Sequence, residues 1–442
     1  MPEFLTLLPP DEARDLLLSH LPQPVIDSES IDVISALGRV LAGGVTAPHP
    51  LPEFQRSTVD GYAVRARDTF GASDSLPAYL TLVGEVPMGD TPLFDIGAGQ
   101  CALIHTGGML PKGTDAVVML EYTQIARSGL LPRSAHLHLR QVQVSQSPEQ
   151  SENDEIEIFR AVADGENVIR IGEDVAQGQM VLPKGRVMRP AEIGGLLALG
   201  ILSIRVVRKI RVGLISTGDE VIDPTQSPRP GQVRDINSYT LGALVEKSGG
   251  VAKRYGIIRD QFQALKDAAA QALSECDALL ITAGSSASTR DMTADVIRSL
   301  GEPGVLVHGI NTRPGKPTIL GVCNGRAVIG LPGNPVSALV NGYLFVVPVI
   351  EKLSGALPAH KATVLARLTV NLSSQAGRED WWPVKLLPSP SRRGAGGEVY
   401  DADPIFGKSN LIFTLASADG LLRIPPDATG LSAGEIVEVI LL

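Results

Sequence analysis

Apolar and polar positions alternate along residues 210–348 in a pattern that predicts a parallel sheet. Three apolar runs, 210–215, 278–283 and 327–332, each lead into a turn rich in Gly, Ser, Thr or Asn. Helix-like segments separate the runs, and strands that alternate with helices are typical of parallel α/β domains. In such sheets the ligand crevice lies outside the carboxyl ends of the strands. We therefore expect the three polar turns to share one edge and to form the reaction centre.

Helical spacing of apolar residues, or a capping residue, predicts helices in six segments of the chain. Asn237 and Asp260 are both placed to cap helices that follow them. The last segment is a long apolar helix that we expect to leave the sheet. The predicted helices are 11–21, 190–200, 237–249, the segment after Asp260, 293–300 and 336–353.

Short runs punctuated by Gly and Pro dominate the rest of the chain. Residues 76–145 predict a small, mostly β domain, and residues 362–442 a small β-barrel or sandwich. Pro48, Pro50 and Pro52 indicate a stiff linker before the first of these regions. The polar, acidic segment 144–157 is interpreted as a surface loop.

Composition narrows the class of protein. A chain of 442 residues suggests about three domains, and its net charge of −9 argues against a general nucleic-acid binder. Cys101, Cys276 and Cys323 are scattered, which is typical of buried thiols rather than of disulfides or a zinc site. There is no signal-peptide pattern, and no apolar run near a terminus is long enough to span a bilayer. These features predict a cytoplasmic protein that binds neither nucleic acid nor membrane.

Five polar motifs follow one another along the chain: Ser-Thr-Val-Asp-Gly-Tyr-Ala at 57–63, Gly-Glu-Asp at 172–174, Ser-Thr-Gly-Asp-Glu at 216–220, Pro-Gly-Lys-Pro at 314–317 and Gly-Leu-Pro-Gly-Asn-Pro-Val-Ser at 330–337. In this order they resemble the signature of the molybdopterin molybdenumtransferase family, the type that also forms the E domain of gephyrin. The resemblance covers nearly the whole chain.

The resemblance implies a homodimer of four-domain subunits. Its elongated N-terminal helical and β domain would comprise 1–47 and 160–205, and a β-rich domain would be inserted at 48–159. A doubly wound, mostly parallel α/β domain that binds molybdopterin would span 206–356, and a C-terminal β-barrel 357–442. The active cleft would lie between the α/β domain of one subunit and the inserted domain of the other.

The reaction implied is the last step of molybdenum cofactor assembly. Molybdenum from molybdate enters the dithiolene of adenylated molybdopterin, AMP is released, and Mg²⁺ assists. Cleavage of a pyrophosphate suits Mg²⁺, which binds carboxylates together with substrate phosphates. The resemblance gives catalytic roles to six residues, of which Glu220 and Asp291 would also bind the metal. These six are Asp60, Thr106, Asp174, Glu220, Asp260 and Asp291.

Substrate-binding positions carried over from the family lie mostly in the polar turns. Lys316 and Arg313 suit a phosphate or molybdate oxyanion, although as bare residues they could equally be surface charges. Without the resemblance, Asp260 would be only a helix cap and Asp60 only a turn residue. The substrate-binding set is Ser216, Thr217, Gly284, Ser285, Ser286, Arg313, Lys316, Pro332, Gly333, Asn334, Pro335 and Ser409.

The chain departs from the family pattern at four positions. Ala283 and Ser288 stand where glycines are usual, Gly309 replaces a lysine, and segment 378–383 lacks the second arginine that is expected near Pro383. The oxyanion site is therefore expected to be less basic than usual. Three alternatives to the molybdenum transferase stay open: a diverged, non-catalytic protein that binds molybdopterin or the cofactor, a scaffold protein, and a tungsten-inserting enzyme.

Overall fold

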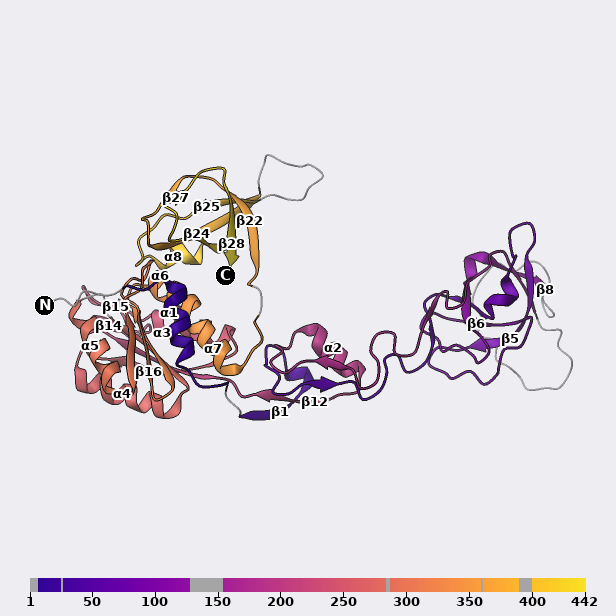
Figure 1. The fold of residues 1–442 in the computed structure, drawn as a ribbon, viewed down its shortest axis with the longest axis horizontal. Helices are drawn as coiled ribbons and strands as arrows, with labels where there is room; N and C mark the ends of the chain where they lie inside the picture. The colour runs from indigo at the N-terminus through magenta and orange to yellow at the C-terminus, as the bar shows by residue number, and fades with distance from the viewer. Residues whose placement is uncertain (1–6, 25–26, 128–153, 284–286, 359–360, 389–399) are drawn as a thin grey trace. The chain divides into compact units, whose positions relative to one another are not determined.

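The structure is a computed structural model that describes residues 7–24, 27–127, 154–283, 287–358, 361–388 and 400–442 (Figure 1). The chain divides into two compact units. The first unit contains Met1–Gly43, Pro183–Gly194 and Leu202–Leu442, and the second contains Gly44–Leu182 and Gly195–Ile201. The finer division into four domains stays a prediction.

A six-stranded, mostly parallel sheet forms the centre of the first unit. The three predicted apolar runs are its neighbouring strands β13, β17 and β21, which pair in parallel. Strands β17 and β21 are buried almost throughout, as central parallel strands require, because both of their faces are covered. In spatial order the strands are β16 (Val251–Ile258), β13 (Arg211–Thr217), β17 (Ala278–Ala283), β21 (Arg326–Pro332), and the antiparallel β20 (Ile319–Cys323) and β18 (Pro303–His308).

Helices cover both faces of this sheet (Figure 1). Leu17, Leu241 and Phe345 are buried in the core on one face, while Leu265 and Ile297 are buried on the other. The first face carries α1 (Pro10–Ser19), α3 (Asn237–Lys247), α6 (Pro335–Asn341), a π-helical turn (Gly342–Val346) and α7 (Val347–Ser354); the second carries α4 (Phe262–Glu275) and α5 (Ala287–Ser299). The predicted alternation of strands and helices is confirmed.

The prediction that the long apolar helix leaves the sheet is wrong. The continuous helical segment Pro335–Ser354 packs its apolar side into the core shared with β13, β17 and β21. Within the described part of the chain it is the one helix long and apolar enough to cross a membrane. However, 67% of its most apolar window is buried inside the protein.

Both helix-cap predictions are wrong. Asn237 is the first helical residue of α3, and its side-chain Nδ2 donates instead to the carbonyl of Gly333 at 2.8 Å. The amide of Ser238 in the first turn donates to the Asp235 carboxylate at 3.1 Å. For α4 the residue before the helix is Gln261 rather than Asp260, and it makes no side-chain cap bond.

The C-terminal region folds into a closed five-stranded barrel, which confirms the barrel alternative of the prediction. Ala366, Val384, Leu422 and Val439 fill its core. A short helix that the sequence pattern did not predict, α8 (Ile412–Ala416), interrupts the strands. The barrel order is β24 (Glu379–Pro388), β25 (Tyr400–Pro404), β22 (Thr363–Leu368), β28 (Ile436–Leu441) and β26 (Gly420–Ile424), which pairs again with β24. The two-residue strands β23 (Leu372–Ser373) and β27 (Gly430–Leu431) pair beside it.

A short strand pairing joins the α/β sheet region to the barrel. Strand β19 (Thr312–Arg313) runs parallel to the start of β24, with Thr312 opposite Glu379 and Arg313 opposite Asp380. The Thr312 hydroxyl also donates to the Glu379 carbonyl at 3.2 Å. The loop that follows Arg313 is thereby held against the barrel wall.

The second unit is built on a six-stranded β-sheet, as predicted for its β-rich region. Tyr62, Leu80, Val118 and Ile156 contribute to its core. The strand order is β7 (Ala116–Met119), β4 (Gly61–Val64), β6 (Gln100–Ile104), β5 (Ala78–Val86), β9 (Glu155–Ile158) and β8 (Thr123–Arg127). Two short antiparallel pairs accompany it: β3 (Arg56–Ser57) with β10 (Val168–Ile169), and β2 (Val45–Thr46) with β11 (Met180–Leu182).

The predicted acidic loop at 144–157 is wrong at its C-terminal end. Residues 155–158 form β9, which pairs with both β5 and β8. Ile156 and Ile158 are fully buried and alternate with two glutamates, so the segment is a strand with one apolar face. Residues 144–153 lie outside the described residues.

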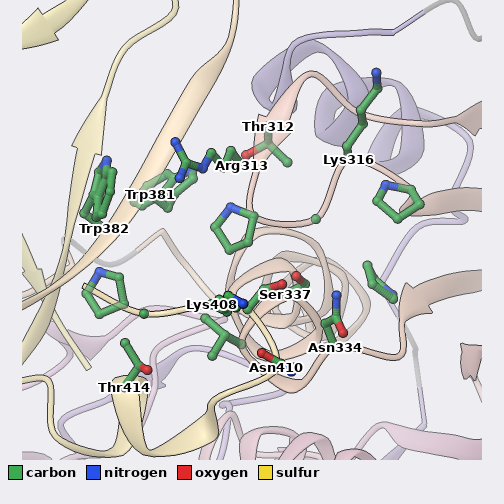
Figure 2. Close-up of a pocket in the computed structure, with 18 of the residues that line it drawn as sticks. Thr312, Arg313, Lys316, Asn334, Ser337, Trp381, Trp382, Lys408, Asn410 and Thr414 are labelled. Carbon is green, nitrogen blue, oxygen red and sulfur yellow. The ribbon is translucent and has the colours of Figure 1, made fainter. Parts of the chain in front are cut away.

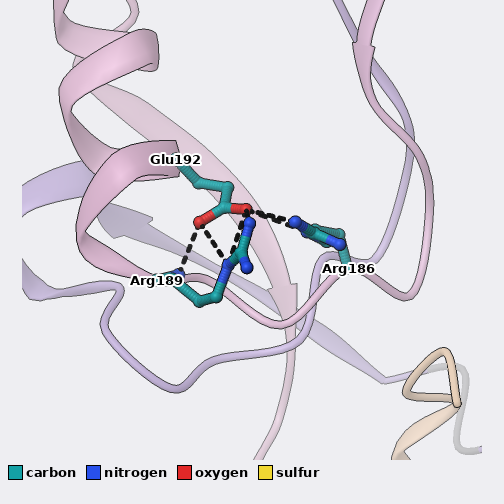
Figure 3. Close-up of polar contacts among 3 residues, drawn as sticks. All are labelled: Arg186, Arg189 and Glu192. Atoms are coloured by element: carbon teal, nitrogen blue, oxygen red, sulfur yellow. Dashed lines mark hydrogen bonds and ion pairs between the residues drawn. The ribbon is translucent and has the colours of Figure 1, made fainter. Parts of the chain in front are cut away.

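A buried carboxylate organises the start of helix α2 (Pro190–Ala198), near the antiparallel pair β1 (Ser28–Asp32) and β12 (Ser203–Val207). Glu192 accepts hydrogen bonds from Arg186 and Arg189, each with a guanidinium nitrogen 2.6 Å from Oε1 (Figure 3). The Glu192 side chain is only 4% exposed. Chiefly through the Arg189 bond, its pKa falls from 4.5 to about 2.

Candidate functional site

The carboxyl ends of β13, β17 and β21 open into a pocket of about 640 Å³, which we call the edge pocket. It lies where the pattern of polar turns predicted a ligand crevice. The pocket is closed on one side by the short parallel pair β14 (Val221–Ile222) and β15 (Val233–Arg234) and by the start of α3. Six residues of the predicted site line it: Ser216, Thr217, Glu220, Gly333, Asn334 and Pro335.

A buried hydroxyl and carboxylate network forms part of the edge-pocket wall. Asp235, only 6% exposed, accepts hydrogen bonds from the Ser216 hydroxyl at 2.8 Å and the Ser238 hydroxyl at 2.6 Å. Thr282 donates to the Ser216 oxygen at 3.3 Å. This network fixes the orientation of Ser216, since its proton is committed to a buried carboxylate. Asp235 was not predicted as a site residue, and its only signal in the sequence is an acidic residue two positions before a predicted helix.

A second hollow of about 740 Å³, the cationic pocket, lies between the loop after β19 and the barrel (Figure 2). Four cations from three segments line it, and none of the described residues in its lining is an aspartate or a glutamate. Arg313, Lys316, Pro332, Asn334 and Ser409 belong to the predicted site, whereas Arg378 and Lys408 were missed. Only the fold brings Lys408 to this pocket, because it comes from the barrel, about ninety residues after Lys316.

The cations of this pocket are held in different ways. Arg378 makes two bonds to the fully buried Asp380, at 2.6 and 2.9 Å. Arg313 lies over the Trp382 ring, with its guanidinium carbon 5.2 Å from the ring centre. Its Nη1 is 3.7 Å from Oδ2 of Asp380. Among the described residues, neither Lys316 nor Lys408 forms an ion pair with a carboxylate. The two arginines are therefore pre-positioned, and the two lysines supply less constrained charge.

Asn341 holds the loop that carries Lys316 against helix α6. Its Nδ2 donates to the Pro314 carbonyl at 3.1 Å and to the Ser337 carbonyl at 2.8 Å. Gly315 lies so close to this amide, at φ +110°, that an added Cβ would be 1.7 Å from Nδ2. Only glycine fits there. On the other side of the pocket, Val336 at the start of α6 donates its amide to the carbonyl of Ser409 at 3.0 Å.

The edge pocket and the cationic pocket adjoin, because Asn334 and Asn410 line both. One pocket offers hydroxyl, amide and carboxylate groups, and the other offers positive charge. A ligand that joins a polar ring system to anionic groups could therefore extend through both pockets.

Three predicted residues lie in the second unit. Asp60 and Thr106 are together, because the Asp60 Oδ1 accepts the Thr106 amide at 2.8 Å and its hydroxyl at 3.1 Å. The amide bond is the main reason that the pKa of Asp60 lies below its usual range. His105 is beside them and bonds Glu85 at 2.8 Å. Asp174 is exposed on a separate turn, where its amide donates to the Leu51 carbonyl.

The remaining predicted residues are not brought into either pocket. Asp260 follows β16 and Asp291 is exposed on α5, but neither is among the residues that line the two pockets. Gly284, Ser285 and Ser286 lie outside the described residues.

The described residues also include no group of three or more His, Cys, Asp or Glu that could hold a metal ion. Two carboxylates, Glu220 and Asp235, line the edge pocket. Asp235 is committed to its hydroxyl network, so Glu220 is the carboxylate open to a ligand. A single available carboxylate suits Mg²⁺, which often binds one or two carboxylates and takes its other ligands from substrate phosphates and water.

Models of three protein domains match this chain along most of its length. Residues 8–200 match the "MoeA N-terminal region (domain I and II)", and residues 365–442 match the "MoeA C-terminal region (domain IV)". Residues 213–352, which contain the central sheet and the edge pocket, match the "Probable molybdopterin binding domain".

Known proteins resemble the chain over its whole length. It is 31% identical to the molybdopterin molybdenumtransferase of Nostoc sp., over 94% of this chain and 89% of the relative. It is 30% identical to the molybdopterin molybdenumtransferase of Haemophilus influenzae, over 97% of each chain. The crystal structure of the molybdopterin biosynthesis MoeA protein from Pyrococcus horikoshii superposes with a TM-score of 0.80, at 32% identity and over 99% of this chain and all of that one.

Proposed function

This chain belongs to the molybdopterin molybdenumtransferase family, and we propose that it inserts molybdenum from molybdate into adenylated molybdopterin with release of AMP. This reaction would be the last step of molybdenum cofactor biosynthesis. The observation that carries the proposal is the junction of a cation-lined pocket with the polar pocket at the carboxyl edge of the sheet. The substrate combines heterocyclic rings with phosphates, and the second substrate is an oxyanion.

The cationic pocket supplies the charge that an oxyanion needs. The lining of this pocket contains four cations and no described carboxylate, and the hydroxyls of Ser337 and Ser409 add neutral donors. The cations are Arg313, Lys316, Arg378 and Lys408. Guanidinium groups and ammonium groups make short, charge-assisted hydrogen bonds to tetrahedral oxyanions. Because Asp380 already holds Arg378, we assign the bulk of the attraction to the lysines and Arg313. Molybdate or a substrate phosphate would bind here.

The edge pocket would hold the rest of adenylated molybdopterin. Ser216 and Thr217 end β13, and the Gly333–Asn334–Pro335 turn ends β21, so both face the ligand. Glu220 is the carboxylate available to Mg²⁺, and Asp291 remains the second proposed ligand. Bound Mg²⁺ would neutralise phosphate charge during pyrophosphate cleavage.

We also propose that the protein acts as a homodimer in the cytoplasm. The family resemblance assigns Asp60, Thr106 and Asp174 to the half of the cleft formed by the inserted domain. Asp60 and Thr106 support this assignment because they are exposed, adjacent and hydrogen-bonded to each other. Asp260 keeps its proposed catalytic role next to the end of β16.

The test mixes the purified protein with adenylated molybdopterin, molybdate and Mg²⁺ and follows AMP and cofactor formation. The Lys316→Ala variant should need roughly tenfold more molybdate for half-maximal AMP release. A matched control, Lys385→Ala, changes an exposed lysine that lines neither pocket and should behave like the wild type. Tight binding of the adenylated substrate without AMP release would instead favour a non-catalytic binding or scaffold protein.

Tungstate provides a second arm of the same assay. It is a tetrahedral dianion of nearly the same size as molybdate, so the cationic pocket gives no physical reason to exclude it. Faster AMP release with tungstate than with molybdate would assign the chain to tungsten insertion.

A further inference from the structure

Two buried polar atoms in the edge pocket have no hydrogen-bond partner among the described residues. They are the hydroxyl oxygen of Thr217 and the side-chain carbonyl oxygen of Asn237. Both residues line this pocket, and they are only 2% and 8% exposed. Buried polar groups are nearly always paired in folded proteins, because leaving one unpaired destabilises the fold. A pair of such atoms in one pocket points to a ligand that completes them.

No other described residue that lines this pocket has a buried side-chain polar atom without a hydrogen-bond partner. Ser216, Thr282 and Asp235 bond one another within the network described above. The unpaired atoms of Thr217 and Asn237 are therefore an exception in a pocket wall whose other buried side chains are hydrogen-bonded.

The orientation of Asn237 is fixed by its own tether. Its Nδ2 donates to the Gly333 carbonyl at 2.8 Å. A rotated amide would place two carbonyl oxygens against each other, so Oδ1 must be the atom left over. The group that Asn237 offers to a ligand is an acceptor, and it requires an N–H or O–H donor. The Thr217 hydroxyl beside the end of β13 can either donate or accept.

We propose that Asn237, with Thr217, recognises the amino-substituted edge of a heterocycle in the edge pocket. An exocyclic amino group would donate to the Asn237 Oδ1, and a neighbouring ring nitrogen would pair with the Thr217 hydroxyl. This inference rests on the proposed function, whose substrate carries two rings of this kind, a pterin and an adenine. Asn237 is thus a specificity-determining residue, whereas the cations of the adjoining pocket attract any anionic group of the ligand.

The experiment compares ligands that differ at the amino group alone. Binding is measured by calorimetry for pterin against lumazine, which has a keto group in place of the 2-amino group. A second pair is AMP against purine riboside 5′-monophosphate, which lacks the 6-amino group. The wild type should prefer the amino-bearing member of one pair roughly tenfold, the scale of one buried hydrogen bond. The pair that shows the preference identifies the ring.

Variants separate recognition from the structural tether. In Asn237→Ala the ratio of the two dissociation constants within the pair should fall from about ten to nearly one. The near-isosteric Thr217→Val should weaken binding of the preferred ligand without unfolding the protein. Asn237→Asp keeps an acceptor but loses the donor to Gly333, so it should keep a preference even if both ligands bind more weakly. A residue that only holds the Gly333 turn would weaken both members of a pair equally and leave the preference intact.

The inference is overturned if the wild type shows no preference in either pair, or if Asn237→Ala retains it. It can fail separately from the proposed function. AMP release without a preference for the amino-bearing ligand would contradict the recognition role alone. A preference for that ligand without AMP release would contradict the transferase reaction and leave the recognition role supported.

Discussion

Replacing the buried carboxylate of Glu192 should destabilise the start of α2 in a pH-dependent way. Glu192 accepts bonds from Arg186 and Arg189, and its pKa falls from 4.5 to about 2 in the folded protein. A shift of this size corresponds to about 3 kcal/mol. Because the two arginine side chains are 38% and 62% exposed, solvent screens part of the attraction. We expect Glu192→Gln to cost about 2 kcal/mol at pH 7.

The sign of the pH dependence follows from the depressed pKa. The Glu192 contribution is fully present above its unfolded pKa near 4.5 and is lost as the pH falls towards 2. The difference between wild type and Glu192→Gln should therefore be constant from pH 6 to 8 and fall to about 1 kcal/mol at pH 3.5.

Hydrogen exchange of peptides covering 186–200, in low urea, measures this difference locally. A local probe is needed because a chain with two compact units does not unfold in a single step. Asp295→Asn is the control, because it breaks an exposed pair with Arg298 and should cost less than about 0.5 kcal/mol. Equal protection of wild type and Glu192→Gln, or a difference that does not shrink at pH 3.5, would refute the reasoning.

Three further variants test the site. Asp235→Ala removes the acceptor of three buried donors and should lower the local opening free energy, measured by hydrogen exchange at the start of α3, by about 3 kcal/mol; a loss under about 1 kcal/mol would show that the network is dispensable. Gly315→Ala forces a Cβ into the Asn341 amide, so it should lower the melting temperature and weaken molybdate binding, and an unchanged molybdate affinity would contradict the loop's role. Glu220→Gln should raise the Mg²⁺ concentration needed for AMP release by roughly tenfold with unchanged thermal unfolding, whereas an unaltered Mg²⁺ dependence would remove Glu220 from the metal site.

The central sheet was predictable because local sequence determines it. Mostly apolar runs that end in polar turns mark buried parallel strands, and 210–215, 278–283 and 327–332 became three neighbouring strands. By contrast, β9 was predicted as a loop because its segment is rich in acidic residues. Glu155 and Glu157 face away from the core that Ile156 and Ile158 fill.

The candidate site was predictable only in part, because its walls come from distant segments. The turns after β13 and β21 reach the edge pocket as expected, but Arg378 and Lys408 join Arg313 and Lys316 only once the barrel docks on β19. Asn237 was assigned to a cap because the sequence pattern cannot distinguish the residue before a helix from its first residue. The tether to Gly333, 96 positions later, reveals its orientation.

The most direct test of the transferase is the stoichiometry of a single turnover. Enzyme in excess is mixed with adenylated molybdopterin, molybdate and Mg²⁺, and both AMP and dithiolene-bound molybdenum are counted. The coupled reaction predicts one AMP released for each molybdenum inserted, with no AMP formed when molybdate is omitted. AMP release that does not depend on molybdate, or binding of both substrates without either product, would contradict the assignment.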